Sequence, residues 1–195
     1  MSGPTEATPG LHAWIDESGS DQRQDPGTYI LAAAITSETS EDYMRQAMMR
    51  LRLPGQRKLH WHDEKDRRRR QISTAIASLE QNYLVVVRTS DPSDTQKRRR
   101  NKCMERLLVE LEMLGVTHAT LESRGAADDR RDLDLVQALR GTRRLSPALR
   151  IDHLQGPKEP LLWVPDAVCG AVTTARVTSD EYLEILGDQV AIIHI

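Results

Sequence analysis

The sequence has few aromatic residues and almost no cysteine. It contains three Trp, four Tyr and no Phe, so Leu, Val, Ile, Ala and Met must fill the core of the 195-residue chain. Its two cysteines, Cys103 and Cys169, form neither a metal-binding spacing nor a disulfide framework. Both lie in apolar helical patterns, which is typical of buried thiols in a reducing compartment. We therefore expect no zinc site and no disulfide bonds.

Several other features are missing. The longest apolar run, from Tyr29 to Ile35, is too short to cross a bilayer, and the first ten residues lack the apolar segment of a signal peptide. There is no Walker loop, no Gly-x-Gly-x-x-Gly fingerprint and no Gly-x-Ser-x-Gly elbow. The net charge of -2 gives no bulk attraction to nucleic acid, but it allows a local basic patch. These absences favour a cytoplasmic, soluble protein without a membrane partner.

The hydrophobic pattern indicates the fold class. We expect residues 1–10 to form a disordered tail and residues 11–195 to form a single domain. Two apolar stretches joined by a polar loop predict a hairpin of strands, and later strands alternate with helices. This order predicts an α/β fold with a mixed central sheet flanked by helices. The strands are expected at 11–16, 28–35, 83–89, 116–122 and 148–154, and the helices at 40–53, 63–80, 95–114, 132–140 and 165–176, with a short helix near 182.

Three acidic residues that are far apart in sequence lie at the boundaries of apolar elements. Asp16 ends the first strand, Glu122 ends the strand at 116–122, and Asp166 lies in the apolar segment that leads into the last long helix. Three carboxylates at one sheet edge suit Mg²⁺ or Mn²⁺, and such ions promote phosphodiester cleavage. The alternative is that each acid is an ordinary loop or helix-terminal residue, as Asp166 would be near a helix N-terminus.

Four neighbouring residues are further candidates. Glu17 follows Asp16 directly and points to the opposite face if the strand continues, so we predict Asp16 as the metal ligand and keep Glu17 as an alternative ligand. His60 is a candidate for proton transfer to a leaving oxygen, although a simply buried or solvated His is the alternative. Arg124 and Lys58 are candidate substrate-binding residues, because cations bind phosphates.

These motifs resemble those of the proteins grouped as domain-of-unknown-function 3800, which look like members of the RNase H-like superfamily. The matching residues are Asp16-Glu17-Ser18-Gly19, Lys58-Leu59-His60, Glu122-Ser123, and Asp166 with Gly170. The resemblance covers about residues 11–178 and implies an RNase H-like sheet with a metal-dependent nuclease site at Asp16, Glu122 and Asp166. The sequence departs from the family pattern at Val164-Pro165, directly before Asp166, which shifts the expected start of the helix.

The leading hypothesis is a nuclease that uses Mg²⁺ or Mn²⁺ to hydrolyse phosphodiester bonds of DNA or RNA. Asp16, Glu122 and Asp166 would bind the cation, His60 would transfer a proton and Arg124 would contact the phosphate. The alternative is a non-catalytic binding or assembly module on the same RNase H-like scaffold. The apolar segment 190–195 is expected to cover an edge strand, either of its own chain or of a second copy in a homo-oligomer.

Overall fold

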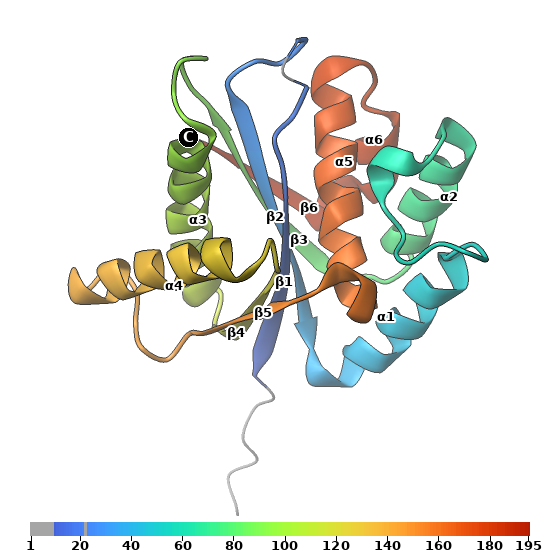
Figure 1. Cartoon of the computed structure of the whole chain (residues 1–195). Helices are drawn as coiled ribbons and strands as arrows, with labels where there is room; N and C mark the ends of the chain where they lie inside the picture. The colour runs from blue at the N-terminus through green and yellow to red at the C-terminus, as the bar shows by residue number, and fades with distance from the viewer. Residues whose placement is uncertain (1–9, 22) are drawn as a thin grey trace, which may run out of the picture.

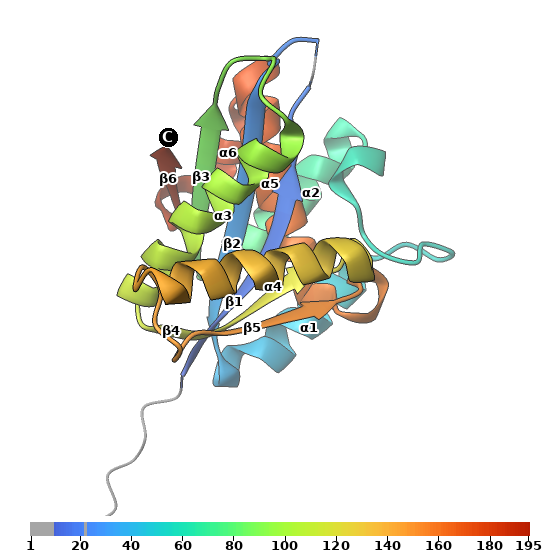
Figure 2. The same ribbon diagram turned by 60° about the vertical axis from the view of Figure 1, so that its left-hand side comes forward.

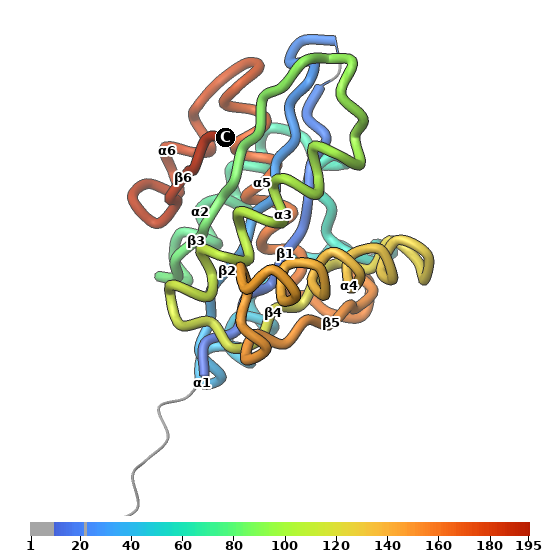
Figure 3. The backbone as a smooth tube through the Cα atoms, turned by 90° about the vertical axis from the view of Figure 1, so that its left-hand side faces the viewer, coloured from blue at the N-terminus to red at the C-terminus, as the bar shows by residue number. Residues whose placement is uncertain are grey.

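One mixed sheet of six strands runs through the computed structural model, which describes residues 10–21 and 23–195. Except for residue 10, the expected tail lies outside the described residues. The strand order is β5-β4-β1-β2-β3-β6, and β5 and β6 lie at opposite edges of the sheet (Figure 3). The strands are β1 (Leu11–Ser18), β2 (Thr28–Ser37), β3 (Asn82–Thr89), β4 (Val116–Glu122), β5 (Arg150–Leu154) and β6 (Val190–His194).

The strand directions follow from the connections. The hairpin predicted at the start of the chain is confirmed, because β1 pairs antiparallel with β2, and β2 pairs antiparallel with β3. Helices connect the remaining strands, so β4 lies parallel to β1, β5 parallel to β4, and β6 parallel to β3. The C-terminal segment therefore covers the edge strand β3 of its own chain.

Helices cover both faces of the sheet (Figures 1 and 2). Helices α3 and α4 pack on one face, and α1, α2, α5 and α6 lie on the other. This arrangement confirms the predicted α/β fold with helices around a mixed sheet. The helices are α1 (Glu38–Leu51), α2 (Asp66–Ala77), α3 (Gln96–Met113), α4 (Ala126–Gly141), α5 (Trp163–Val177) and α6 (Glu181–Leu186).

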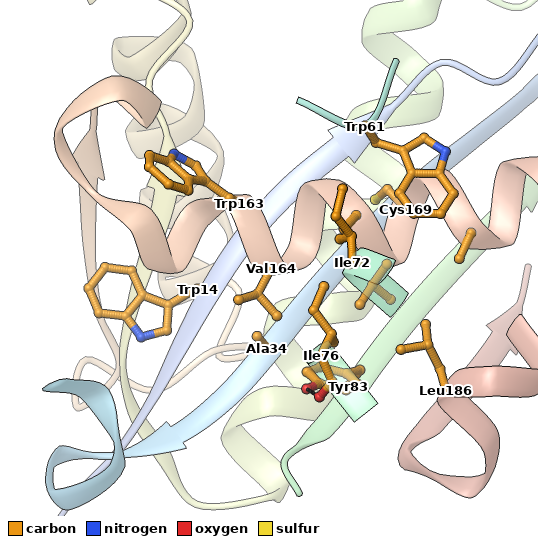
Figure 4. Close-up of a cluster of buried hydrophobic side chains, with 14 of the residues drawn as sticks. Trp14, Ala34, Trp61, Ile72, Ile76, Tyr83, Trp163, Val164, Cys169 and Leu186 are labelled. Carbon is orange, nitrogen blue, oxygen red and sulfur yellow. Dashed lines mark hydrogen bonds between the residues drawn. The ribbon is translucent and has the colours of Figure 1, made fainter. Parts of the chain in front are cut away.

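Each face of the sheet has its own hydrophobic core, because alternate side chains of a strand point to opposite faces. Trp14 packs into the core on the α5 face, where Trp61 and Trp163 also lie (Figure 4). Its neighbours in β1, Ala13 and Ile15, pack on the α3 face. This alternation determines where the next two residues of β1, Asp16 and Glu17, direct their carboxylates.

Four predicted helix starts were wrong. Helix α1 begins after Ser37 rather than after Ser40, and α2 begins at Asp66, after a short 3-10 turn at Trp61–Asp63. Helix α4 begins at Ala126, six residues earlier than expected. Helix α5 begins at Trp163, so Pro165 is its third residue and not its first. Proline is tolerated there because the first N–H groups of a helix have no partner within the helix.

The predicted buried thiols are confirmed: Cys103 and Cys169 are both buried and free. No helix among the described residues is long and apolar enough to span a membrane.

Candidate active site at the sheet edge

Asp16 and Glu122 are brought together by two neighbouring parallel strands. Ile15 of β1 is in register with Leu121 of β4, so the residues that follow each of them lie side by side at the same edge of the sheet. Asp16 is on the same face as Trp14, the face that α5 covers. In β4, Ala119 and Leu121 pack on the α3 face, so Glu122 also points to the α5 face.

Asp166 reaches the same edge from the first turn of α5. Its side chain is 7% exposed and accepts two hydrogen bonds from one segment, at 2.7 Å from the backbone N–H of Trp61 and at 2.9 Å from Nδ1 of His60. One turn further along α5, Cys169 Sγ lies 3.4 Å from the backbone oxygen of Asp16 and donates to it. This contact places the Asp166 face of α5 against the end of β1.

The three carboxylates are close enough to interact electrostatically. Burial raises the pKa of the Asp16 carboxyl well above its ordinary value, and the negative charges of Asp166 and Glu122 raise it further. Lys58 opposes this effect by lowering the pKa of Asp16. The edge of the sheet is therefore a place where negative charge is concentrated and a cation is favoured.

Lys58 supplies one such cation. Its Nζ donates to Oε1 of Glu122 at 2.6 Å, and both side chains are largely shielded from solvent. Burial alone would lower the pKa of Lys58, but the hydrogen bond and charge of Glu122, together with Asp16 and Asp166, raise it overall. The other carboxylate oxygen, Glu122 Oε2, is buried without a hydrogen-bond partner among the described residues. Glu122 thus has one oxygen paired and one oxygen free for a further ligand.

His60 lies at the solvent side of the acids. Its side chain is 40% exposed, and its neighbour His62 is also exposed. The hydrogen bond to Asp166 raises the pKa of His60 above 6.5, although burial opposes the shift. A cavity of about 180 Å³ opens beside His60 and Asp166, and it is also lined by Arg69, Cys169 and Thr173. A ligand in this cavity would touch both members of the His60–Asp166 pair.

Three carboxylates form a donor set that suits a hard divalent cation, and the buried, unpaired Oε2 of Glu122 is available as a ligand. In the conformation described, however, no group of three or more His, Cys, Asp or Glu side chains within residues 10–21 and 23–195 is arranged to hold a metal ion. The ammonium group of Lys58 occupies one side of Glu122 instead. The donor chemistry fits Mg²⁺ or Mn²⁺, and binding requires these side chains to move closer together.

Two of the sequence-predicted site residues lie elsewhere. Strand β1 continues to Ser18, so Glu17 points to the α3 face, where its carboxylate accepts from Nε of Arg100 at 2.6 Å. Arg124 turns to the same face, with its guanidinium 3.5 Å from Glu17 and 3.4 Å from Asp132. Neither side chain joins Asp16, Glu122 and Asp166. The roles of Glu17 as a metal ligand and Arg124 as a phosphate contact near the acids remain predictions that require rearrangement.

Sequence reasoning missed how three residues shape the site, although one of them, Gly170, belongs to the motif that carries the family resemblance. The backbone of Trp61 holds Asp166, and Gly170 makes room for the Trp61 ring: a Cβ at Gly170 would lie 2.1 Å from that ring. Gly156 allows Glu122 to turn inward, because a Cβ there would lie 2.4 Å from Glu122 Oε1. The helical Gly170 in an otherwise apolar run was the available signal, because a glycine inside a helix needs a packing reason.

No family model matches this sequence, and no curated protein matches it. Similarity to solved structures is clear. The structure of a mutant protein of Bst-RNase HIII has a TM-score of 0.54 and 13% identity, covering 91% of this chain and 65% of that chain. That of Bst-RNase HIII in complex with Mn²⁺ has a TM-score of 0.52 and 13% identity, covering 92% of this chain and 66% of that chain.

The ribonuclease H2 from Pyrococcus horikoshii OT3 is also similar, with a TM-score of 0.46 and 15% identity, covering 90% of this chain and 75% of that chain. The chain spans about two thirds of the length of the two RNase HIII chains. The assignment to domain-of-unknown-function 3800 remains a prediction. The mixed six-stranded sheet flanked by helices is an RNase H-like fold.

Proposed function

We propose that this protein is a divalent-metal-dependent nuclease that hydrolyses phosphodiester bonds of DNA or RNA. The observation that carries the proposal is the convergence of Asp16, Glu122 and Asp166, from two parallel strands and one helix, at one sheet edge. The RNase H-like fold supports it, since the similar solved structures are described as RNases and one of them as a complex with Mn²⁺.

In this proposal the three carboxylates hold Mg²⁺ or Mn²⁺. The chemistry that such a cation supplies when bound is activation of the attacking water and stabilisation of the negative charge on the phosphate. Burial raises the pKa of Asp16 most, and the charges of Asp166 and Glu122 raise it further, so these carboxylates would repel one another less around a bound cation. Lys58 must leave Oε1 of Glu122 for both oxygens of that carboxylate to be available.

His60 is the candidate proton donor. Its Nδ1 is fixed by Asp166, and its Nε2 makes no hydrogen bond with the residues that the structure describes. Because the hydrogen bond to Asp166 raises the pKa of His60, a larger fraction of the imidazole is protonated near neutral pH. Nε2 can therefore deliver a proton to the leaving oxygen as the bond from that oxygen to phosphorus breaks. Asp166 then acts both as a ligand and as the group that orients His60.

The test compares wild type with Asp16→Asn and with Asp134→Asn, a matched control in which an exposed acid of α4 loses its charge. Each purified protein is incubated with Mn²⁺ and with single-stranded, duplex and RNA–DNA hybrid oligonucleotides. The cleavage rate of Asp16→Asn should be at least about 100-fold lower than that of wild type. Removing a residue that only orients a metal ligand typically costs about 10–100-fold in activity, and removing a ligand itself should cost more. Asp134→Asn should cleave like wild type.

Equal cleavage by wild type and Asp16→Asn would identify a contaminating nuclease and overturn the proposal. The alternative, a non-catalytic binding or assembly module, is favoured by one observation: the ion pair between Lys58 and Glu122 already neutralises part of the acidic edge. Crystals soaked in Mn²⁺ separate the two functions. Metal on two or more of Asp16, Glu122 and Asp166 favours the nuclease, whereas an edge that keeps the Lys58–Glu122 pair and takes no metal favours the module.

A further inference from the structure

A second polar cavity lies on the other face of β1, between the first turns of α3 and α4. Its volume is about 290 Å³, and four cationic side chains line it: Lys97 and Arg100 of α3, Arg124 of the loop after β4, and Arg131 of α4. In Figure 2, α3 and α4 lie over this face of the sheet. Three separate segments thus bring cations to one cavity, and three acids, Glu17, Asp128 and Asp132, line it as well.

The floor of this cavity is a rigid network of ion pairs. Arg100 and Asp132 are only 4% and 2% exposed, and both terminal guanidinium nitrogens of Arg100 donate to the carboxylate of Asp132. Nε of Arg100 donates to Glu17, and Nε2 of His153 lies 3.1 Å from Asp132. Buried charges of this kind are tolerated only when they are paired. Arg100 is therefore held in place and its charge is already matched.

The remaining cations of the cavity are less completely paired than Arg100. Arg124 reaches Glu17 and Asp132 only at 3.5 and 3.4 Å, beyond the usual range for a charge-assisted hydrogen bond. Arg131 donates to Asp128 of its own helix at 2.6 Å through one terminal guanidinium nitrogen, and its side chain remains 59% exposed. Lys97 makes no ion pair or hydrogen bond with any of the described residues, and no acid lies in the first turn of α3 to balance it. These three side chains retain donors that a bound anion would use.

The cavity adjoins the carboxylate edge. Glu17 lines both this cavity and the smaller one beside His60 and Asp166, and it is the direct neighbour of Asp16. The end of β1 thus separates the two cavities. A strand passing the end of β1 would meet the carboxylates on one side and the cations on the other.

We propose that this cavity binds a backbone phosphate of the nucleic-acid strand through Lys97, Arg124 and Arg131. The inference rests on the proposed function, because the phosphate belongs to the same substrate that the carboxylate edge cleaves. Phosphate oxygens accept from lysine as a point charge and from arginine as a fork, so this donor set fits a phosphate diester. Binding here would hold the strand without touching the bases, so it contributes affinity and position but no sequence preference.

The experiment measures binding without cleavage. Fluorescent oligonucleotides (single-stranded DNA, single-stranded RNA, duplex DNA and an RNA–DNA hybrid) are titrated in EDTA, and anisotropy gives the affinity at several salt concentrations. The pocket variant is Lys97→Gln with Arg131→Gln. The control variant is Arg98→Gln with Arg130→Gln, which removes the same charge from the adjacent positions of the same two helices, where the side chains pair with Asp94 and Asp134 instead.

The pocket variant should bind the probe that wild type binds most tightly about tenfold more weakly. The slope of its log affinity against log salt concentration should also fall by about one, the equivalent of one phosphate contact. The control variant should stay within about twofold of wild type. Equal weakening in both variants, no weakening in the pocket variant, or a wild type that binds none of the four probes at low salt would overturn the proposal. Thermal unfolding of each variant shows that the fold is retained.

Titration with Mn²⁺ separates this inference from the nuclease proposal. The pocket variant should bind Mn²⁺ like wild type, since its substitutions lie across the sheet from Asp16, Glu122 and Asp166. If wild type binds no Mn²⁺ and cleaves nothing, but the pocket variant still loses oligonucleotide affinity, the nuclease proposal fails and the phosphate site stands. If wild type binds Mn²⁺ and cleaves, but the pocket variant binds oligonucleotides normally, only the phosphate site fails.

Discussion

At the scale of single residues, two adjacent acids have different surroundings because successive side chains of a strand point to opposite faces of the sheet. Asp16 and Glu17 differ by one position, and β1 stays extended through Ser18, so their carboxylates lie on opposite faces of the sheet. Asp16 meets two other carboxylates, whereas Glu17 meets Arg100 and Arg124. The alternation itself was predictable from the sequence. The arginines that pair with Glu17 were not, because no local pattern links residue 17 to residue 100.

Lys58 is expected to compete with a divalent cation. Its Nζ holds Oε1 of Glu122 at 2.6 Å, so a metal ion that uses this oxygen must first displace it. Lys58→Gln should therefore bind Mn²⁺ about tenfold more tightly, which corresponds to about 1.4 kcal/mol. Without metal the variant should be less stable by about 1–3 kcal/mol, because Glu122 loses its partner. Calorimetric titration and urea unfolding measure the two effects.

Arg57→Gln is the matched control for Lys58→Gln, because Arg57 is exposed and precedes Lys58 directly. It should leave both the Mn²⁺ affinity and the stability unchanged. Unchanged or weaker Mn²⁺ binding in Lys58→Gln would show that the ammonium group does not occupy the cation position.

Gly170 is expected to be intolerant of any side chain. A Cβ would lie 2.1 Å from Cδ1 of Trp61, so the indole ring and the backbone N–H that holds Asp166 would have to move. Gly170→Ala should destabilise the protein by about 1–3 kcal/mol, the usual cost of overpacking, in urea unfolding followed by Trp fluorescence. Gly141→Ala is the control, since nothing lies within 4 Å of the added Cβ. Equal stability of the two variants would contradict the packing argument.

At the scale of elements, the strands were easier to predict than the helix ends. Strand β4 has the predicted bounds, because its β-branched residues and the preceding Gly115 define it locally. The start of α4 was missed because Gly125 provides no side-chain cap, although Asp128 and Asp129 in the first turn are typical of a helix start. The start of α5 differs from the predicted one because two buried residues, Trp163 and Val164, precede Pro165 in the helix. Tertiary burial decides the start of α5, and burial leaves no local signal.

The pairing of β1 with β4 predicts a pH effect at the end opposite the carboxylates. His12 of β1 stacks on His118 of β4, with ring centroids 4.2 Å apart. Burial lowers the pKa of His12 below 6.5; the charges of His118 and Arg45 lower it further, while Glu41 opposes them. The folded state therefore takes up this proton less readily than the unfolded state, and the contribution of His12 to stability falls as the pH drops below about 6.5.

His12→Gln should lose this part of the pH dependence. As the pH falls from about 7 to about 5, wild type should lose unfolding free energy relative to the variant. This relative loss should be no more than about 1.4 kcal/mol per pH unit. Urea unfolding across this range measures it, and His194→Gln, at the far edge of the sheet in β6, is the control. A difference between His12→Gln and wild type that does not change with pH would contradict the prediction.

At the scale of the whole molecule, the sheet order brings the candidate site together. The strand order places β4 beside β1, and their parallel direction brings Asp16 and Glu122 to one edge. Helix α5 crosses that edge and adds Asp166. The sequence supported the fold class and the choice of these three acids. It did not predict that Lys58 pairs with Glu122 or that the acids are not arranged around an ion, because both depend on side-chain packing between distant segments.

The stability of the whole domain is expected to depend on pH through Asp16. Burial, with the charges of Asp166 and Glu122, raises the pKa of Asp16 well above its ordinary value of 3.8. Because the folded carboxyl holds its proton more tightly than the unfolded one, wild type loses stability as the pH rises from about 4 through the folded pKa. Asp16→Asn cannot ionise, so without metal it should be the more stable protein at pH 8, by about 1.4 kcal/mol for each unit by which the pKa is raised.

The difference between Asp16→Asn and wild type should vanish near pH 3, where both states of wild type are protonated. Saturating Mn²⁺ should reverse the order at pH 8, because an ion that binds only the folded wild type adds stability in proportion to the logarithm of its concentration. Thermal unfolding of both proteins with and without Mn²⁺ at several pH values provides the measurement. A wild type that is the more stable protein at pH 8 without metal, or an equal response of both proteins to Mn²⁺, would show that the three carboxylates do not act as one site.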